Sequence, residues 1–529
     1  MADASGTESQ RILRNSGTVT FFTLLSRILG AARDLVIAHF FGAGGLTDAF
    51  IQAFTIPNVF RRLTAEGALT LAFLPLYTEI REKRGLDAAR NFASQTLGLV
   101  LLGTLGITAL GMVFAPQLVY LFAAGFADDP EQFGLTVKLT RWMFPYLMLV
   151  SVVAWAMGVL NAERRFATPA AAPILLNLAI IASALAVAPL LDQPIFALAY
   201  GVLAGGIAQV LLQQPALRGA GQPFAPRPFG KDPDIQRLLR LLGPSLFGVA
   251  VYQINLIILR NLASFLPSGQ VTHYYNASRL AELTLGVFAF AVANASFPEL
   301  SKHTAQADWE QARKTLRFSA ATTGLIIWPA ALGLVTAAEP IISMLYRHGA
   351  YTLEDVRSTT HALQAFALGL PAVALVRLQT SACYALQDTK TPVRIAALGL
   401  VITAGLGWYL SQTLEVTGLA LGLSAGTWVQ AILLAFGLRR HSRLQGTLPG
   451  LDFLRQFIAA LLMGLLTAWI SFQWDWTSGS LIAANWGVFL GILLGAALAY
   501  FALVLLLRDP HAHSLLRLSF RRFSSEKNA

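Results

Sequence analysis

Three charged residues lie near the middle of the first long apolar stretch of the chain, residues 17–42. They are Arg27, Arg33 and Asp34, in the sequence SRILGAARD. The stretch is long enough to cross a bilayer only if these charges cross with it. A charged side chain at a helix centre costs roughly 2.5–3.5 kcal/mol on insertion scales, so such residues usually face a water-filled cavity and bind a substrate or an ion. We therefore predict a polar cavity whose arginines bind an anion through their planar guanidinium groups.

Helical geometry limits how these charges can share one cavity. At about 100° per residue, Arg27 and Asp34 lie on one face, whereas Arg33 points about 100° away. A single cavity can hold all of them only if it is wide. The alternative is that both arginines reach to a membrane interface. Each lies within a few residues of the segment centre, however, and this depth favours a functional role.

A second group of polar residues opens the next apolar stretch, residues 46–79. Thr47 is expected to cap this helix at its N-terminus. The residues that follow have the i, i+4, i+7 spacing of one helical face, and they are Asp48, Gln52 and Thr55. This spacing predicts a polar stripe that faces the same cavity.

Two further arginines could line that cavity. Arg61 lies shortly after Pro57, which removes a backbone donor and should interrupt and kink the helix. It is either a cavity residue or an anchor at the cytoplasmic interface. Arg279 lies about nine residues into a later apolar stretch, at a depth that matches the arginines of the first helix. Glu282, one turn later, is either its structural partner or part of the same site.

The composition is that of a polytopic membrane protein. Of 529 residues, 55% are hydrophobic and 13% are charged, and the mean hydropathy is +0.58, which is too apolar for a soluble chain of this length. The net charge of +11 does not indicate nucleic-acid binding, because the basic residues lie in alternate loops between apolar stretches. This pattern is a topology signal that predicts cytoplasmic termini. The single cysteine, Cys383, excludes a disulfide framework and a multi-cysteine metal site.

Apolar segments near or above the roughly 20 residues that cross a bilayer recur along the whole chain. They predict an all-α polytopic fold with about fourteen transmembrane helices. We expect these helices near residues 17–42, 46–79, 92–123, 136–160, 170–190, 195–217, 237–264, 270–300, 316–338, 358–386, 393–413, 416–438, 453–473 and 481–507.

The chain also resembles itself at an offset of about 224 residues, as in LFAAG at 121–125 and LYRHG at 345–349. Chance similarity is the alternative, but the offset is common to several matches. Because six helices in each half then have the same orientation, we predict two six-helix lobes related by pseudo-two-fold symmetry, with a site between them. The expected domains are an N-lobe at 1–217, a cytoplasmic linker at 218–236, a C-lobe at 237–443, two helices forming a lipid-tail groove at 444–507, and a basic cytoplasmic tail at 508–529.

No catalytic site is expected. The sequence holds no HExxH, no Walker lysine loop and no Cys/His cluster, and we assign the eight histidines to loops and tail. Arginine is in excess at membrane depth, which favours an anionic ligand. A cation exporter would need buried carboxylates instead. These features predict a transporter and not an enzyme.

The sequence resembles the MurJ (MviN) lipid II flippases over nearly its whole length. The N-terminal cluster is the most specific part, and the matching runs are SRILG at 26–30, ARD at 32–34, FGAG at 41–44, TDAF at 47–50, PN at 57–58, RR at 61–62 and AEGA at 65–68. Later matches are GFA at 125–127, LN at 160–161, RF at 165–166, AP at 172–173, Asn177 and DTKTP at 388–392.

The resemblance implies a bacterial inner-membrane protein of the MOP superfamily. It implies movement of lipid II, the undecaprenyl-pyrophosphate-linked peptidoglycan precursor, from the cytoplasmic to the periplasmic leaflet by alternating access, without ATP. The implied partners are lipid II, membrane lipids and other cell-wall synthesis proteins, with no nucleic acid. By motif match, the implied substrate-binding residues are Arg27, Arg33, Asp34, Asp48, Arg61, Arg279 and Glu282.

The sequence differs from the family pattern at two positions, and some relatives have an ion site that must be considered. Thr55 stands where some relatives have lysine, and Ser278 stands where many have aspartate, which leaves the counter-ion of Arg279 open. No cofactor is implied, but Na⁺ or the membrane potential could drive the cycle. Relatives can carry a sodium site in the second lobe, for which Asn255 and Asp388 are the polar candidates.

Other functions compete with lipid II transport. A multidrug/cation antiporter of the same superfamily is disfavoured by the cationic cavity and by the two extra helices. A flippase for another polysaccharide-linked lipid would use the same chemistry. A membrane glycosyltransferase or phosphatase acting on such a lipid would need clustered acids or histidines facing one leaflet, and the sequence does not supply them.

Overall fold

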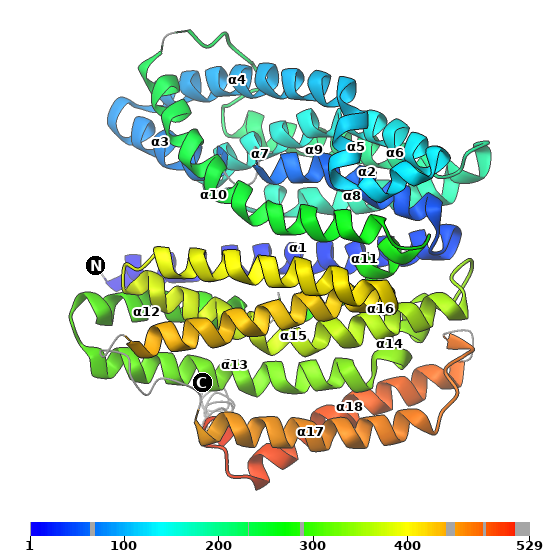
Figure 1. The fold of residues 1–529 in the computed structure, drawn as a ribbon. Helices are drawn as coiled ribbons and strands as arrows, with labels where there is room; N and C mark the ends of the chain where they lie inside the picture. Colours follow the sequence, from blue (N-terminus) through cyan, green and yellow to red (C-terminus); the bar gives the residue numbers. More distant parts are fainter. Residues whose placement is uncertain are drawn as a thin grey trace. The chain divides into compact units, whose positions relative to one another are not determined.

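The structure is a computed structural model that describes residues 2–63, 69–230, 232–285, 290–440, 450–479 and 483–513. Every regular element within these ranges is a helix (Figure 1). The predicted all-α class is therefore confirmed.

The helices follow one another with short connections. Those of the first half are α1 (Ala2–Phe41), α2 (Gly45–Arg61), α3 (Thr70–Arg84), α4 (Leu86–Val113), α5 (Ala115–Phe122), η2 (Ala124–Asp128), α6 (Pro130–Met143), α7 (Tyr146–Ala162), α8 (Ala167–Ala186), η3 (Ala188–Leu190), α9 (Phe196–Gly219) and α10 (Pro233–Ser264). Those of the second half are α11 (Gln270–Thr284), α12 (Phe290–Ala305), α13 (Trp309–Thr336), α14 (Ala338–Tyr346), α15 (Leu353–Ala385), α16 (Lys390–Arg440), α17 (Leu451–Phe472) and α18 (Ala483–Leu506).

Nine helices in the described ranges are long and apolar enough to cross a membrane, which makes the chain a multi-pass membrane protein. The count of fourteen crossings stays a prediction. In the segment predicted at 46–79, α2 contains Pro57 and continues to Arg61, α3 begins at Thr70, and residues 64–68 lie outside the described residues. The break predicted between residues 413 and 416 falls at Glu415, where α16 bends.

Helix ends repeat at a constant offset. α1 and α10 end at Phe41 and Ser264, α4 and α13 end at Val113 and Thr336, and α7 and α15 end at Ala162 and Ala385; each pair is 223 residues apart. This spacing agrees with the self-similarity of the sequence.

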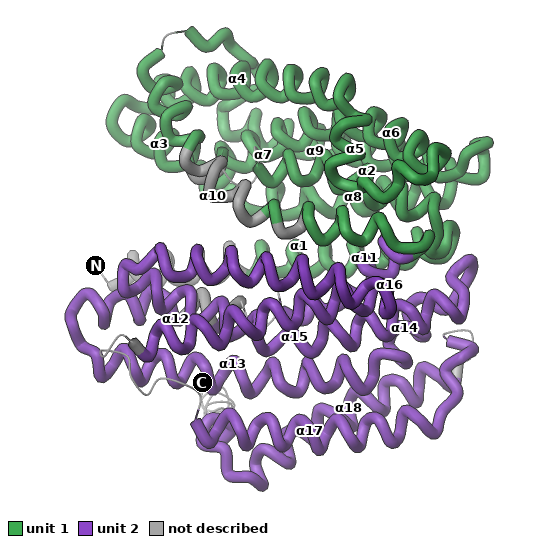
Figure 2. The backbone as a smooth tube through the Cα atoms, viewed as in Figure 1, with its two compact units in different colours: residues 1–269 green, residues 270–529 purple. Residues whose placement is uncertain are grey.

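The chain divides into two compact units, Met1–Gly269 and Gln270–Ala529 (Figure 2). Sequence reasoning placed α10 in the second lobe, but α10 packs on α3, α4, α5 and η2 of unit 1. Arg84 of α3 and Asp234 of α10 form an ion pair outside the predicted membrane-spanning segments. The hydrogen bond to the carboxylate of Asp234 raises the pKa of the Arg84 guanidinium. The lobe boundary predicted from the sequence repeat therefore differs from the boundary between the two compact units. The predicted lobe boundary stays a prediction.

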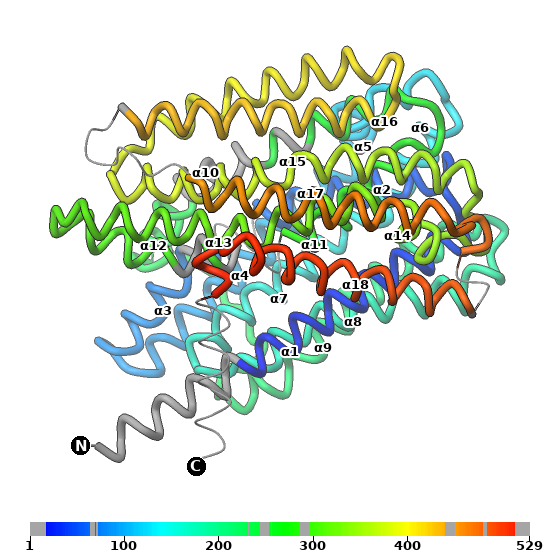
Figure 3. The backbone as a smooth tube through the Cα atoms, turned by 90° about the horizontal axis from the view of Figure 1, so that it is seen from below, coloured from blue at the N-terminus to red at the C-terminus, as the bar shows by residue number. Residues whose placement is uncertain are grey.

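Each unit has its own apolar core. In unit 1, Trp155 of α7 is fully buried, and Phe73 of α3 stacks on Phe92 of α4. In unit 2, Trp328 of α13 contacts Phe457 of α17, with 4.8 Å between ring centroids. α17 thus packs along α13, and α18 packs on α17 (Figure 3).

The two halves of α16 are in close contact. Glu415 has φ 48° and ψ −132°, a conformation that non-glycine residues rarely adopt, and the chain reverses there. A Cβ added at Gly418 would overlap the backbone of Leu410, and one added at Gly422 would overlap the backbone of Gly407. The absence of side chains at these glycines lets the two half-helices approach to backbone contact.

Candidate functional site

A buried polar group lies between α1 and α8 in unit 1. Arg33 and Asp34 are 8% and 5% exposed, and Nη2 and Nε of Arg33 lie 2.6 Å and 3.0 Å from Oδ1 of Asp34. Nη1 of Arg33 donates to Oδ1 of Asn177 over 3.3 Å. The amide of Asn177 in turn donates to the carbonyl of Ser26 over 3.1 Å. The structure therefore joins two predicted site residues in one network.

Arg27 lies apart from this network. Its side chain is exposed, on a face of α1 that also exposes Phe21, Leu24 and Ile28. Helical angles placed Arg27 and Asp34 on one face, yet Asp34 bonds its neighbour Arg33, because a long guanidinium side chain can reach back along the helix.

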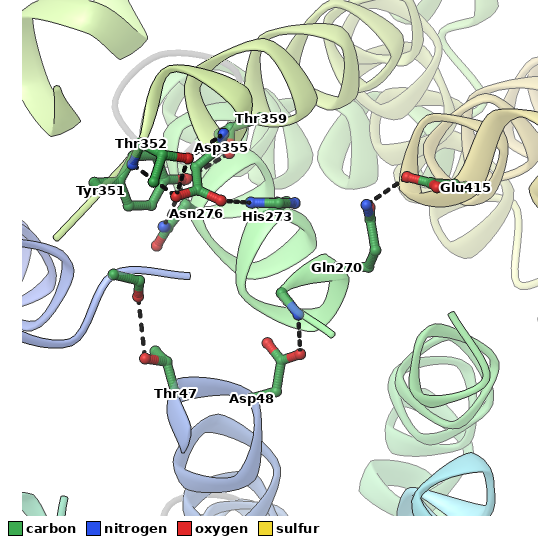
Figure 4. Close-up of polar contacts among 12 residues, drawn as sticks. Thr47, Asp48, Gln270, His273, Asn276, Tyr351, Thr352, Asp355, Thr359 and Glu415 are labelled. Carbon is green, nitrogen blue, oxygen red and sulfur yellow. Dashed lines mark hydrogen bonds and ion pairs between the residues drawn. The ribbon is translucent and has the colours of Figure 1, made fainter. Parts of the chain in front are cut away.

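The polar stripe on α2 is buried against other parts of unit 1. Oδ2 of Asp48 accepts a hydrogen bond from the amide of Gly269 over 2.7 Å (Figure 4). The amide of Gln52 donates to the carbonyl of Arg260 over 2.9 Å, and the guanidinium of Arg260 donates to the hydroxyl of Thr55. The stripe thus holds the end of α10 and the loop after it.

Thr47 is not the cap that the sequence predicted. α2 begins at Gly45, with Gly44 in the capping position and no side-chain cap. The hydroxyl of Thr47 instead donates to the carbonyl of Gly42 over 3.0 Å. The cap prediction was wrong because the capping position is Gly44, three residues before Thr47.

Arg61 and Arg279 have partners on their own helices. Nε of Arg61 donates to Oδ1 of Asn58 over 2.9 Å. Arg279 and Glu282 lie 3.8 Å apart, and their side chains are 38% and 65% exposed, so this pair is a weak one. Arg279 belongs to unit 2 and the other predicted arginines to unit 1. Their convergence in one cavity stays a prediction.

Sequence reasoning missed a polar cluster at the start of α11. His273, which we assigned to a loop or the tail, is in α11 and 4% exposed. Its Nε2 lies 3.0 Å from Oδ1 of Asp355 at the start of α15 (Figure 4). Beside it, the hydroxyls of Tyr351 and Thr359 are 2.5 Å apart. A histidine inside a predicted apolar segment was the available signal.

The polar candidates for a sodium site receive no support. Asp388 caps α16, since its Oδ1 accepts from the amides of Lys390 and Thr391 over 3.1 Å and 3.0 Å. The side chain of Asn255 lies outside the described residues. Within the described part of the chain, no three His, Cys, Asp or Glu residues cluster, and the sodium site stays a prediction.

The nine long apolar helices among the described residues define a multi-pass α-helical membrane protein. The buried Arg–Asp pair lies in α1, which is not one of those nine. A family model described as "Lipid II flippase MurJ" matches residues 37–487. This chain belongs to that family.

Individual proteins agree with the family match. The lipid II flippase MurJ of Burkholderia cenocepacia is 36% identical over 87% of this chain and 90% of its own length. A probable lipid II flippase MurJ of Vibrio cholerae is 34% identical over 95% of this chain and 97% of its own length.

Solved structures share the fold. A structure titled lipid II flippase MurJ, inward closed conformation, has a TM-score of 0.76 at 24% identity and covers 94% of this chain and 99% of its own. An inward-facing multidrug resistance MATE family transporter of the MOP superfamily has a TM-score of 0.67 at 16% identity and covers 81% of this chain and 98% of its own.

Proposed function

We propose that this protein is a flippase that moves lipid II from the inner to the outer leaflet of the bacterial cytoplasmic membrane by alternating access. Family membership over most of the chain carries the proposal. Both termini would lie in the cytoplasm, as the distribution of Lys and Arg predicts. The protein would act as a transporter without enzymatic activity, driven by Na⁺ or by the membrane potential.

The substrate poses two physical problems. Its pyrophosphate and sugar head cannot cross hydrocarbon, and arginines at membrane depth offer paired donors that match a pyrophosphate. The proposed substrate-binding residues are Arg27, Arg33, Asp34, Asp48, Arg61, Arg279 and Glu282. Among them, Arg27 is exposed, and the side chains of Arg279 and Glu282 are 38% and 65% exposed, so these three are accessible to a ligand.

The polyprenyl tail has to remain in an apolar environment. We assign it to α17 and α18, which lie outside the repeat. Support comes from an exposed apolar stripe on α17 at helical spacing, which consists of Leu454, Ile458, Leu461, Leu465 and Trp469. A protein ending after residue 443 should insert but transport long-chain lipid poorly. Equal transport of long-chain and short-chain lipid by this truncated protein would remove the tail assignment.

Multidrug/cation antiport is the alternative that the fold allows, because a MATE transporter has the same architecture. A flippase for a different polysaccharide-linked lipid is the other. Both are disfavoured by the curated relatives, which are named as lipid II flippases at 36% and 34% identity.

Proteoliposomes provide the test. Purified protein is reconstituted with fluorescent lipid II, with undecaprenyl phosphate bearing one sugar, or with a lipophilic cation, and arrival on the other side is read with a membrane-impermeant quencher. We expect movement of lipid II alone, its loss in Arg27→Ala, and its retention in Arg141→Ala, a control whose guanidinium donates to the carbonyl of Met112. Transport of the cation, with no movement of lipid II, would overturn the proposal.

A further inference from the structure

The first turn of α11 connects two neighbouring helices through buried polar side chains. Gln270 and His273 are 6% and 4% exposed. His273 reaches Asp355 of α15, and the amide of Gln270 donates to the carboxylate of Glu415 at the bend of α16 (Figure 4). One turn of helix therefore lies between two carboxylates.

Each of these side chains also has a buried atom without a partner. These atoms are Nδ1 of His273 and Oε1 of Gln270, and neither has a hydrogen-bond partner among the described residues. Since Nε2 of His273 faces a carboxylate, Nε2 carries the hydrogen and Nδ1 is a bare acceptor. The amide nitrogen of Gln270 faces a carboxylate too, which leaves Oε1 as a second bare acceptor.

The two bare acceptors belong to residues at neighbouring positions of α11. Residues 270 and 273 are one turn apart on one face of α11, and Figure 4 draws Gln270 on the side of His273 opposite Asp355. Two buried acceptors on adjacent positions are unfavourable for each other and for the fold, because neither is paired. One additional hydrogen between them would satisfy both.

We propose that His273 is a proton-binding site, and that the arrangement of α11 described here is its proton-free form, in which Nδ1 and Oε1 are both unpaired. A hydronium ion gives its proton to Nδ1 and is left as water, and the new N–H donates to Oε1 of Gln270 once that amide turns toward it. Protonation thereby joins the contact of His273 with Asp355 and the contact of Gln270 with Glu415 into one hydrogen-bonded chain, which fixes the start of the helix that carries Arg279.

The neighbouring groups do not compete with Nδ1 of His273 for the added proton. Oδ2 of Asp355 is occupied by the amide and hydroxyl of Thr352, at 2.7 Å and 2.8 Å. Between pH 6 and 8 ordinary carboxylates remain charged and histidines titrate. The other titratable or charged groups on the segments of unit 2 around the start of α11 are Arg347, His348, Tyr351, Glu354, Arg357, His361 and Glu415.

The other two histidines in that set have different surroundings. Nε2 of His348 lies 2.7 Å from the carbonyl of Leu345, and His361 is exposed on α15. His361 is therefore a matched control for His273, because it is a histidine of the same unit that lies exposed on α15.

Hydrogen–deuterium exchange of the full-length protein in detergent tests the site without any lipid substrate. Exchange of residues 270–284 is compared at pH 6 and pH 8 after correction for the intrinsic pH dependence of exchange. In the wild type we expect stronger protection at pH 6, by up to about tenfold per pH unit, the limit for one proton. His273→Gln, which keeps an amide donor but cannot titrate, should remove this difference, and His361→Gln should keep it.

A second variant protects the test against misfolding of the first. Gln270→Leu removes the acceptor and leaves the histidine, so it should also lose the acid protection. The proposal is overturned if the wild type shows no pH difference, if His273→Gln or Gln270→Leu retains it, or if His361→Gln abolishes it. Because no lipid II is used, failure here is distinct from failure of the proposed function.

Discussion

Arg33 is paired with the residue next to it in sequence, Asp34, with 2.6 Å between Nη2 and Oδ1. Both side chains are more than nine-tenths buried. The first helix therefore buries a compensated pair of charges, and the two residues cannot be changed independently.

Arg33→Ala should destabilise the protein by about 3–5 kcal/mol, because it leaves the charge of Asp34 buried without its partner. The midpoint of thermal unfolding in detergent measures the effect. The double variant Arg33→Ala/Asp34→Ala should be more stable than the single variant, and a double variant that is less stable would contradict the buried pair.

Arg27→Ala should behave in the opposite way. Its exposed side chain contributes little to folding, so the stability should change by no more than about 0.5 kcal/mol, while support of growth is lost in cells depleted of their own flippase. Arg27→Lys should restore growth only in part, because lysine lacks the planar paired donors. Normal growth of the alanine variant at equal expression would remove Arg27 from the site.

Asp48 is expected to act through its hydrogen bond to the amide of Gly269. Asp48→Ala should cost about 1–3 kcal/mol, since a buried amide then lacks its acceptor. Asp48→Asn keeps an acceptor oxygen and should retain most of the stability. Equal losses in the two variants, measured by thermal unfolding, would show that the charge matters more than the hydrogen bond.

Gly324 of α13 sets the approach of α17. A Cβ at this position would lie 2.5 Å from Oε1 of Gln456 and 2.7 Å from the ring of Phe453, whereas a Cβ at Gly333 would lie 3.9 Å from Met463. Gly324→Ala should therefore lower stability by about 1–3 kcal/mol, and Gly333→Ala should be neutral. Similar unfolding midpoints for both variants would contradict this packing.

The nine membrane spans among the described residues could be predicted from sequence because each is a long local run of apolar residues. The boundary at Glu415 was visible as a gap between two such runs. The continuation of α2 through Pro57 to Arg61 could not be predicted, because a proline usually interrupts a helix.

The charged residues of the site could be found, but their partners could not. A guanidinium can bond a carboxylate at several spacings, so the pairing of Arg33 depends on packing against α8. The capping box of Thr352 and Asp355 was readable as a T-x-x-D pattern. The contact between Gln270 and Glu415 spans 145 residues, and only tertiary packing determines it.

The reversal at Glu415 also has a mechanical consequence. Two half-helices whose backbones touch at Gly418 and Gly422 cannot slide or open without losing that contact. The two half-helices should therefore move as one rigid body during any transport cycle. Bending would be concentrated in segments with looser contacts. A distance measured by spectroscopy between one label on each half-helix should be the same in every state of the protein.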